Sequence, residues 1–181
     1  GARGWLANVG LPVAAVNGGA IVAPGLSLIA SHHLGEVTAR ATLDLLERHA
    51  VDAWVFADGA WLLRDPDGPY IEDHRRTVGF DPVVVPSFDA VINRIDKIVG
   101  VSNLPGHLAK IEAEARSLMR DQVTIDLSRA SFLDCTHPEA NKGRAVQSSV
   151  AIVGVDVRRT AGLGARTNAT ARCEVTGSRL G

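Results

Sequence analysis

The feature that most constrains the fold of this chain is a predicted strand-to-helix junction near its C-terminal end. Residues 132–136 (FLDCT) have the pattern of a short apolar strand, a turn containing Pro138 follows, and Asn141-Lys142-Gly143 begins a predicted helix. The free N–H groups at a helix start and a lysine ammonium both favour a bound anion such as phosphate. A lysine in a first helical turn is more commonly a solvated surface residue, so the junction is a candidate phosphate site and not yet a motif.

Two amphipathic helices are predicted in the middle of the chain, because apolar residues recur at helical spacing over 35–50 and 104–119. The expected buried stripe of the first helix is Val37, Ala41, Leu45 and Leu46, and that of the second is Leu104, Leu108, Ile111, Ala115 and Leu118. No clear pattern covers 70–95.

Short strands surround these helices. The run at 11–16 predicts a buried strand, and a hairpin is expected around Pro24-Gly25. Asp58-Gly59 is typical of a second hairpin turn, and further strands are predicted at 97–101 and 123–127. We therefore expect 20–130 to form a compact layer with helices on one face of a mainly antiparallel sheet, and the two ends to supply βα pieces of a parallel sheet.

Composition excludes several kinds of partner. The sequence has 46% hydrophobic residues, enough for an ordinary core, and a formal net charge of −1 with both signs interspersed. This balance predicts no nucleic-acid or membrane partner and favours a small molecule. Cys135 and Cys173 lie too far apart in sequence to indicate a zinc motif, and they fit a reducing, cytoplasmic environment. The sequence shows neither an apolar run of about 20 residues nor a signal-peptide pattern.

Four segments resemble, in order, landmarks of the Cof-type phosphatases, which are haloacid dehalogenase-like hydrolases with a large α/β cap. The most specific is Asn141-Lys142-Gly143 after a strand ending Leu-Asp-Cys-Thr, and the others are Asn17–Ile21, Asp96–Ser102 and Val175–Ser178. The resemblance implies an α/β fold with a partial doubly wound, Rossmann-like core at 1–19 and 131–181. An α/β cap domain would be inserted at 20–130.

The same resemblance implies a magnesium-dependent phosphatase, a hydrolase of phosphoric monoesters. It would act on small phosphorylated metabolites of the sugar-phosphate kind through an aspartyl-phosphate intermediate. Lys142 matches the catalytic lysine that holds the phosphoryl oxygens. Asn141, Asn17 and His137 are the expected phosphate-binding or substrate-binding residues, and Asp156 is the candidate Mg²⁺ ligand.

Two charged segments lie inside the expected cap. Asp73-His74-Arg75-Arg76 has donors, above all Arg75 and Arg76, that suit a sugar or phosphate oxygen, and a solvated charged strand is the alternative. Residues 64–69 (RDPDGP) imitate the nucleophile motif Asp-x-Asp-Gly-Thr of these phosphatases. A proline follows the glycine where the family has threonine, so a polar turn is the prediction for this segment.

The nucleophile motif and most of the magnesium loop of the family are absent from the sequence. After a candidate strand at 150–154 the chain continues Val155-Asp156-Val157 in place of Gly-Asp-x-x-Asn-Asp, and a helix starting at Asn141 leaves too few residues for a βαβ crossover. We hypothesise that the sequence joins segments of a longer protein, a truncated and degenerate homologue being the alternative. The missing nucleophile also supports a second function, a non-catalytic protein that binds a phosphorylated ligand or another protein.

Overall fold

The computed structural model describes residues 13–15, 20–22 and 28–140, which divide between two compact units. In one unit, β1 (Val13–Ala15), β2 (Ala20–Val22) and β3 (Leu28–Ser31) form an antiparallel sheet in chain order. The hairpin expected around Pro24-Gly25 is the β2–β3 pair. β1 was expected in a parallel sheet and instead pairs antiparallel with β2, because the few residues between them allow a hairpin and not a crossover.

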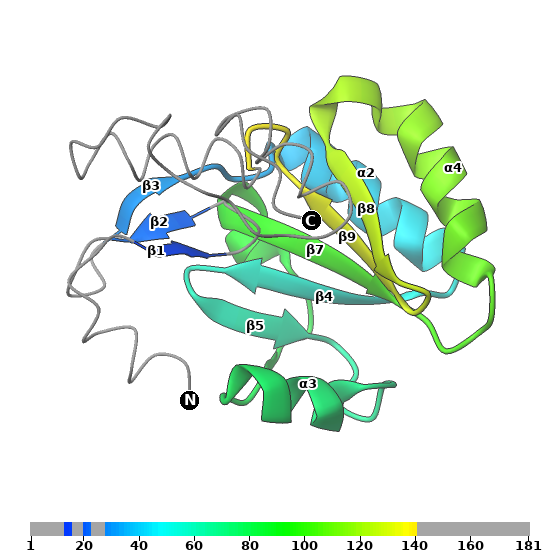
Figure 1. Ribbon diagram of the computed structural model, residues 1–181, viewed down its shortest axis with the longest axis horizontal. Helices are drawn as coiled ribbons and strands as arrows, with labels where there is room; N and C mark the ends of the chain where they lie inside the picture. The colour runs from blue at the N-terminus through cyan, green and yellow to red at the C-terminus, as the bar shows by residue number, and fades with distance from the viewer. Residues whose placement is uncertain (1–12, 16–19, 23–27, 141–181) are drawn as a thin grey trace, which may run out of the picture. The chain divides into compact units, whose positions relative to one another are not determined.

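The other unit contains residues 33–138 and carries most of the described structure (Figure 1). Its elements are α2 (Glu36–Arg48), β4 (Asp52–Ala57), β5 (Ala60–Leu63), α3 (Ile71–Val78), β6 (Val83–Val84), η2 (Asp89–Arg94), β7 (Ile95–Val101), α4 (His107–Met119), η3 (Arg120–Gln122), β8 (Thr124–Arg129) and β9 (Phe132–Thr136). The strands form one six-stranded sheet in the order β6-β5-β4-β7-β9-β8.

The centre of this sheet is β7, which pairs antiparallel with β4 on one side and with β9 on the other. Two hairpins flank it, β4–β5 and β8–β9. The turn between β4 and β5 is the predicted one, and Asp58 and Gly59 both have positive φ, 52° and 75°. Only the pairing of β5 with the two-residue β6 is parallel.

Residues 132–136 were expected in the parallel core, and the structure places them in the antiparallel sheet as β9. The cause is the tight β8–β9 turn, which returns the chain beside β8 and directs β9 between β8 and β7. The expected boundary at 130/131 therefore falls inside a hairpin, and the division lies at 138/139. Residues 20–31, expected with this sheet, belong to the other unit.

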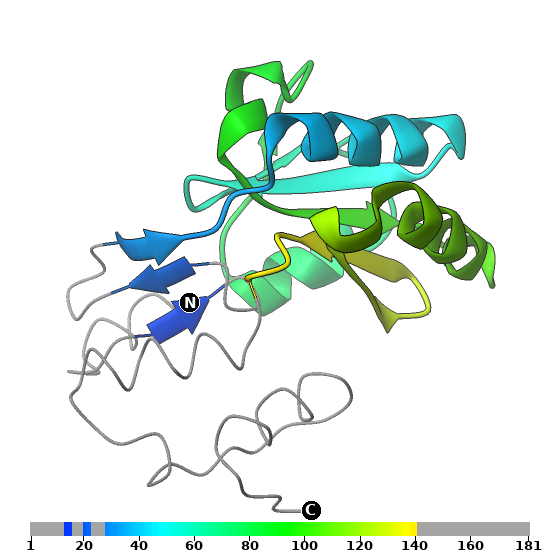
Figure 2. The same cartoon turned by 90° about the horizontal axis from the view of Figure 1, so that it is seen from above.

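Helices α2 and α4 cover the same face of the six-stranded sheet, as predicted (Figures 1 and 2). The fully buried side chains of this core include Leu45, Leu46, Leu108 and Ile111 from the helices, with Val55, Ile98 and Leu133 from the strands. The helices approach the sheet closely at Gly100, where an added Cβ would lie 2.7 Å from Leu46 Cδ2.

The predicted buried stripes of both helices were partly wrong. Val37 is 79% exposed, and Leu104 and Leu118 are each 58% exposed. The helices pack on each other as well as on the sheet, which buries Thr38 and Thr42 on α2 and Met119 on α4. The Thr42 hydroxyl lies 3.1 Å from Met119 Sδ across this helix–helix contact.

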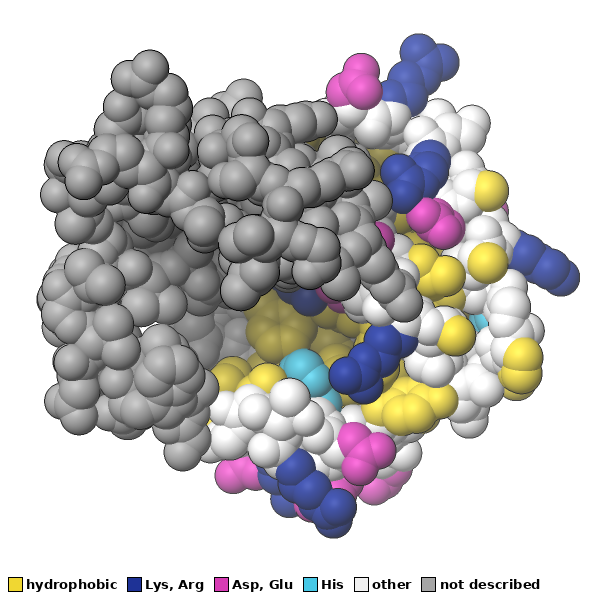
Figure 3. All heavy atoms as spheres, in the orientation of Figure 1, with side chains coloured by type: hydrophobic (Ala, Val, Ile, Leu, Met, Phe, Trp, Pro, Cys, Tyr) yellow, Lys and Arg dark blue, Asp and Glu magenta, His cyan; other side chains and the backbone are white. Residues whose placement is uncertain are grey.

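The opposite face of the sheet is only partly covered. Helix α3 lies over its β4–β5 side, and no other helix that the structure describes packs on the strands beyond it. Figure 3 shows a hollow on this side, where hydrophobic side chains, a histidine and basic side chains gather.

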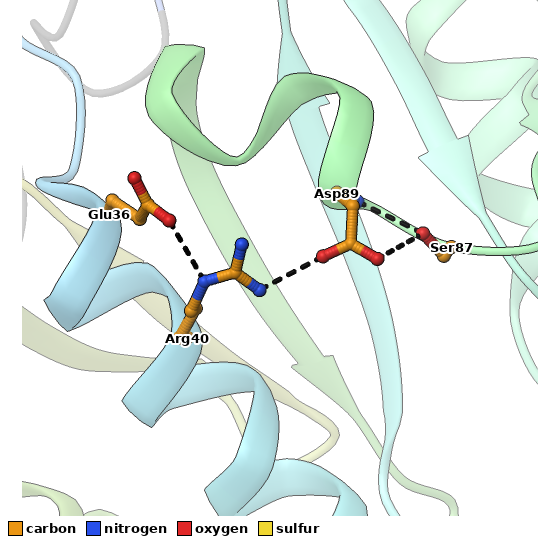
Figure 4. A network of polar contacts seen from close by, with 4 residues as sticks. All are labelled: Glu36, Arg40, Ser87 and Asp89. Carbon is orange, nitrogen blue, oxygen red and sulfur yellow. Dashed lines mark hydrogen bonds and ion pairs between the residues drawn. The ribbon is translucent and has the colours of Figure 1, made fainter.

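A polar network fixes the start of α2 to η2 (Figure 4). Arg40 donates to Glu36 one helical turn earlier, at 3.1 Å, and to Asp89 on η2, at 2.9 Å. Asp89 also accepts from the Ser87 hydroxyl at 2.7 Å, and these two hydrogen bonds lower the pKa of its carboxyl. The part of the chain that the structure describes has no helix of the length and apolarity that a membrane span requires.

Candidate functional site: an aromatic pocket on the open sheet face

The open face carries most of the chain's aromatic side chains. Successive residues of a strand point to opposite faces, so Trp54 and Phe56 of β4, Val99 of β7 and Phe132 of β9 all point away from α2 and α4. The sequence has eight aromatic residues (three Trp, one Tyr, four Phe), and six of them belong to this cluster: Trp54, Phe56, Trp61, Tyr70, Phe80 and Phe132.

Helix α3 forms one wall of the site. It begins after Tyr70, whose φ of 64° is unusual for a non-glycine residue, and it ends at Gly79 with φ 77°. Ile71 is buried against the sheet, and the His74 ring lies 4.8 Å from the Trp54 ring and 4.7 Å from the Trp61 ring, measured between centroids. The Ser131 hydroxyl donates to the Tyr70 oxygen at 3.0 Å and so fixes the ring at the start of the helix.

A buried ion pair lies on the floor beside these rings. Lys97 Nζ is 2.9 Å from Asp134 Oδ2, and the two side chains are only 18% and 9% exposed. The strands β7 and β9 are neighbours, and the two residues are diagonal on one face: Lys97 lies opposite Thr136, two residues from Asp134. Lys97 Nζ also lies 5.9 Å from the centre of the Phe56 ring, within reach of a cation–π interaction.

His74 is the titratable group that this environment changes most clearly. Burial, followed by the positive charge of Lys97, lowers the pKa of the imidazole below its ordinary value, so the ring is neutral at pH 7. Its Nε2 atom is buried and has no hydrogen-bond partner among the described residues, and the same is true of the Trp61 indole N–H. Buried polar atoms are nearly always paired in folded proteins, so these two are exceptions.

Between α3 and the β8–β9 hairpin these residues enclose a cavity of about 410 Å³, which is within the range of small-molecule sites. Phe56, Tyr70 and Phe132 line it as half-buried rings. The polar and charged side chains that line it are Asp73, His74, Thr77, Lys97, Ser128, Arg129, Ser131 and Asp134. The hollow in Figure 3 is the mouth of this pocket. The arrangement can hold an apolar or aromatic group and hydrogen-bond its polar edge.

The predicted site residues are placed as follows. Arg75 and Arg76 lie on α3, are exposed, and form ion pairs with Glu72. The segment 73–76 is a helix and not the charged strand considered as an alternative, and Asp73, His74 and Thr77 face the pocket, whereas Arg75 and Arg76 do not line it. His137 is half-buried and directly follows β9. Asn17, Asn141, Lys142 and Asp156 lie outside the described residues.

Sequence reasoning missed Lys97, Asp134 and the half-buried aromatic rings. A partial signal was present in β4, where Trp54 and Phe56 alternate with Ala53, Val55 and Ala57, and in β9, where Phe132 and Asp134 alternate with Leu133 and Cys135. Strand β7 gave no such signal, since Lys97 shares its face with Val99 and Val101. Residues 64–69, which imitate the nucleophile motif, form the predicted polar turn. In this turn the Asp65 carboxylate accepts a hydrogen bond from the Asp67 N–H at 2.9 Å.

Within the described residues, no group of three or more histidine, cysteine, aspartate or glutamate side chains could hold a metal ion. The adjacent histidines do not share a site, since His33 lies 3.0 Å from Asp96 and His32 lies 3.9 Å from Glu139.

Comparisons with known proteins identify the family. Residues 4–169 match the model of the haloacid dehalogenase-like hydrolase family named Hydrolase_3. No curated protein matches the chain at the level of sequence.

Solved structures are similar to the chain in fold. A haloacid dehalogenase-like hydrolase from Bacteroides thetaiotaomicron superposes with a TM-score of 0.82 at 14% identity, covering 94% of this chain and 65% of that one. A haloacid dehalogenase-like hydrolase from B. subtilis gives 0.79 at 17% identity, with 94% and 68% covered. A subclass IIB sugar phosphatase gives 0.66 at 14% identity, with 80% and 53% covered. The α/β fold class is confirmed, and the chain belongs to the haloacid dehalogenase-like hydrolases.

Proposed function

We propose that this protein is a magnesium-dependent phosphatase that hydrolyses small phosphorylated metabolites, of the sugar-phosphate kind, through an aspartyl-phosphate intermediate. The observation that carries the proposal is the family match over residues 4–169. The fold likeness to a sugar phosphatase supports the substrate class. Since the chain spans only 53–68% of the length of the three structures compared, the activity is a proposal about the whole protein.

In this proposal the unit of residues 33–138 is the cap. Its open face carries a pocket of about 410 Å³, a suitable place for the part of the substrate that does not react. A cap pocket of this kind converts binding energy from the rest of the substrate into orientation of the phosphate ester.

Lys142 is the proposed catalytic cation and Asn141 the residue that positions it. In phosphoryl transfer a protein contributes mainly positioning and charge, so a lysine ammonium beside the phosphoryl oxygens should matter most in the transition state. Magnesium, when bound, would neutralise phosphoryl charge. Asp156 is its proposed ligand. We place the activity in the cytoplasm because the two cysteines of the sequence fit a reducing environment.

The test is hydrolysis of p-nitrophenyl phosphate by the protein, its Lys142→Ala variant and a matched Lys110→Ala variant, whose lysine is exposed on α4. We expect kcat to fall by about 10²–10³ for Lys142→Ala, the scale seen when one preorganised donor is removed, and to stay unchanged for Lys110→Ala. Activity should also disappear with a chelator and return with Mg²⁺. Full activity of Lys142→Ala, or full activity after exhaustive chelation, would overturn the mechanism.

The alternative function is that of a non-catalytic protein that binds a phosphorylated ligand. Folded protein that releases no phosphate in any of these assays, but that binds a phosphate ester in a calorimetric titration, would establish this function in place of the first.

A further inference from the structure

Helix α3 is held to its unit more weakly than α2 and α4 are. Of its eight residues, Ile71 is the buried one, and among the described elements it makes less contact with the strands than α2 or α4. Arg75 and Arg76 both form ion pairs with Glu72 of the same helix. Arg75 also pairs with Asp81, just beyond the helix end. A helix with so few buried apolar contacts belongs to the least stable part of a fold.

The backbone turns sharply at both ends of this helix. Tyr70 before it and Gly79 after it have left-handed conformations, with φ of 64° and 77°. This conformation suits glycine and is unfavourable for tyrosine, which the Ser131 hydroxyl holds through a hydrogen bond to its oxygen at 3.0 Å. Ser131 lies in the turn between β8 and β9, on the opposite wall of the pocket. The hydrogen bond therefore ties the start of α3 to that wall.

The His74 ring is a second point at which α3 is held, and it packs on the aromatic cluster of the sheet. Its centroid lies 4.8 Å from that of Trp54 and 4.7 Å from that of Trp61. His74 Nε2 and the Trp61 indole N–H are both buried without hydrogen-bond partners among the described residues. These atoms disfavour the docked position of the helix, because both would bind water if α3 moved away from the sheet.

The groups that face His74 from the strands oppose a positive charge on its ring. Lys97 on β7 and Arg129 on β8 are cationic, and Asp134 on β9, which would attract an imidazolium, is paired with Lys97 at 2.9 Å. Burial, followed by the charge of Lys97, lowers the pKa of the docked imidazole. In water the same ring would have an ordinary pKa of about 6.5. Protonation of His74 therefore favours a position of α3 in which the ring is hydrated.

We propose that α3 is a hinged lid, which lies on Trp54 and Trp61 while His74 is neutral and lifts from the sheet when His74 gains a proton. Gly79 is the hinge, and the hydrogen bond between Tyr70 and Ser131 is the latch. Lifting the lid widens the pocket as the pH falls. This device is a property of residues 33–138 and does not depend on the proposed function.

Thiol labelling measures the lifting of the lid. Leu63 is 1% exposed and lies in the same cluster as Trp54, Trp61 and Ile71, so a thiol introduced there by Leu63→Cys should react when the lid lifts. Cys135 belongs to the core beneath α2 and α4 and should react only when the whole unit unfolds, which makes it the internal control.

The full chain with Leu63→Cys and Cys173→Ser is labelled with a pyridyl disulfide between about pH 7.5 and pH 5.5, on either side of the ordinary imidazole pKa. Each rate is divided by the rate of the urea-unfolded protein at the same pH. Below about pH 6.5 the corrected rate at the introduced thiol should rise, by at most about tenfold for each pH unit, the limit for uptake of one proton. The corrected rate at Cys135 should stay at least about tenfold lower, because global unfolding is rarer than local opening.

Variants assign the effect to its residues. His74→Gln should remove the pH dependence, whereas His107→Gln on α4 should keep it. Tyr70→Phe and Ser131→Ala should each raise the corrected rate about fivefold at neutral pH, the scale of one hydrogen bond, and should leave the pH dependence unchanged. Their combination should add nothing further, since both remove the same bond.

Acrylamide quenching of Trp54 and Trp61 in a Trp5→Phe protein is the second readout, and it replaces labelling if Leu63→Cys does not fold. Quenching should increase over the same pH range. A pH-independent opening, a pH dependence that survives in His74→Gln, or equal corrected rates at the introduced thiol and at Cys135 would overturn the inference. Neither readout involves phosphate, so the outcome is independent of the phosphatase assay.

Discussion

Replacing Asp134 by asparagine tests the ion pair on the floor of the pocket. Lys97 Nζ and Asp134 Oδ2 are 2.9 Å apart, and both side chains are largely shielded from water. At an effective dielectric constant of about 20, two unit charges at this distance attract by about 6 kcal/mol, and the cost of removing them from water cancels much of this. Asp134→Asn keeps the shape but leaves the ammonium without its counter-charge, so the free energy of unfolding should fall by about 3 kcal/mol.

The assay is urea unfolding followed by tryptophan fluorescence. A Trp5→Phe background leaves Trp54 and Trp61, which lie in the same cluster, as the reporters. Combining Asp134→Asn with Lys97→Met gives a double-mutant cycle, in which we expect a coupling free energy of about 2 kcal/mol.

The exposed pair Arg94–Asp58 is a matched control. Its atoms are also 2.9 Å apart, but the side chains are 47% and 55% exposed. Its coupling free energy should stay below about 1 kcal/mol, because water screens the charges. Equal coupling in the two pairs, or an Asp134→Asn protein within about 0.5 kcal/mol of its parent, would refute the argument that burial makes the pocket pair strong.

Three shorter predictions follow from other buried groups. Gly100→Ala should lower the free energy of unfolding by about 1–3 kcal/mol, because its Cβ would lie 2.7 Å from Leu46 Cδ2. The loss of stability should be smaller in a Leu46→Ala background, and an equal loss in that background would contradict the contact. Burial lowers the pKa of His74, so the unfolded chain binds this proton more readily, and the associated stability is present above about pH 6.5 and is lost as the pH falls. Urea unfolding between about pH 7.5 and pH 5.5 should therefore show a steeper loss in the parent than in His74→Gln, and parallel losses would contradict it. Burial raises the pKa of Cys135 to about 12, so in a Cys173→Ser protein a disulfide reagent should label the thiol only after unfolding, and rapid labelling of the native protein would contradict the burial.

The elements with a strong local pattern were predictable from sequence. The helix at 36–48, the helix at 107–119 and the turn at Asp58-Gly59 appear where the pattern placed them. Their buried faces were less predictable, because helical spacing shows that a stripe exists but not which neighbours cover it. The contact between α2 and α4 buries threonines at 38 and 42 that a hydrophobic pattern does not count.

Helix α3 had no readable pattern for a different reason. Of its eight residues, Ile71 is the buried one, so the segment has almost no apolar period. A left-handed residue precedes it, and Gly79 closes it through a hydrogen bond from its N–H to the Arg75 carbonyl at 2.8 Å. The start at Tyr70 was not predictable either, since a tyrosine with positive φ is uncommon.

The pocket could not be assembled from sequence because its residues come from separate elements. Phe56, Lys97 and Asp134 lie on three strands that meet only through the order β4-β7-β9. A shift of one residue in either pairing would send the lysine or the carboxylate to the opposite face. The site depends on strand register, which local patterns did not determine here.

The central place of β7 also determines how the sheet can assemble in time. The β4–β5 and β8–β9 hairpins are local in sequence and can form quickly, whereas β7 must pair with β4 across the whole chain between Ala57 and Ile95. Closing that loop costs chain entropy before the pairing returns any stability, so we expect the insertion of β7 to be the slow step in the folding of this unit. Until it occurs, each hairpin exposes an unpaired edge, and those edges are the points at which a folding chain would associate with its neighbours.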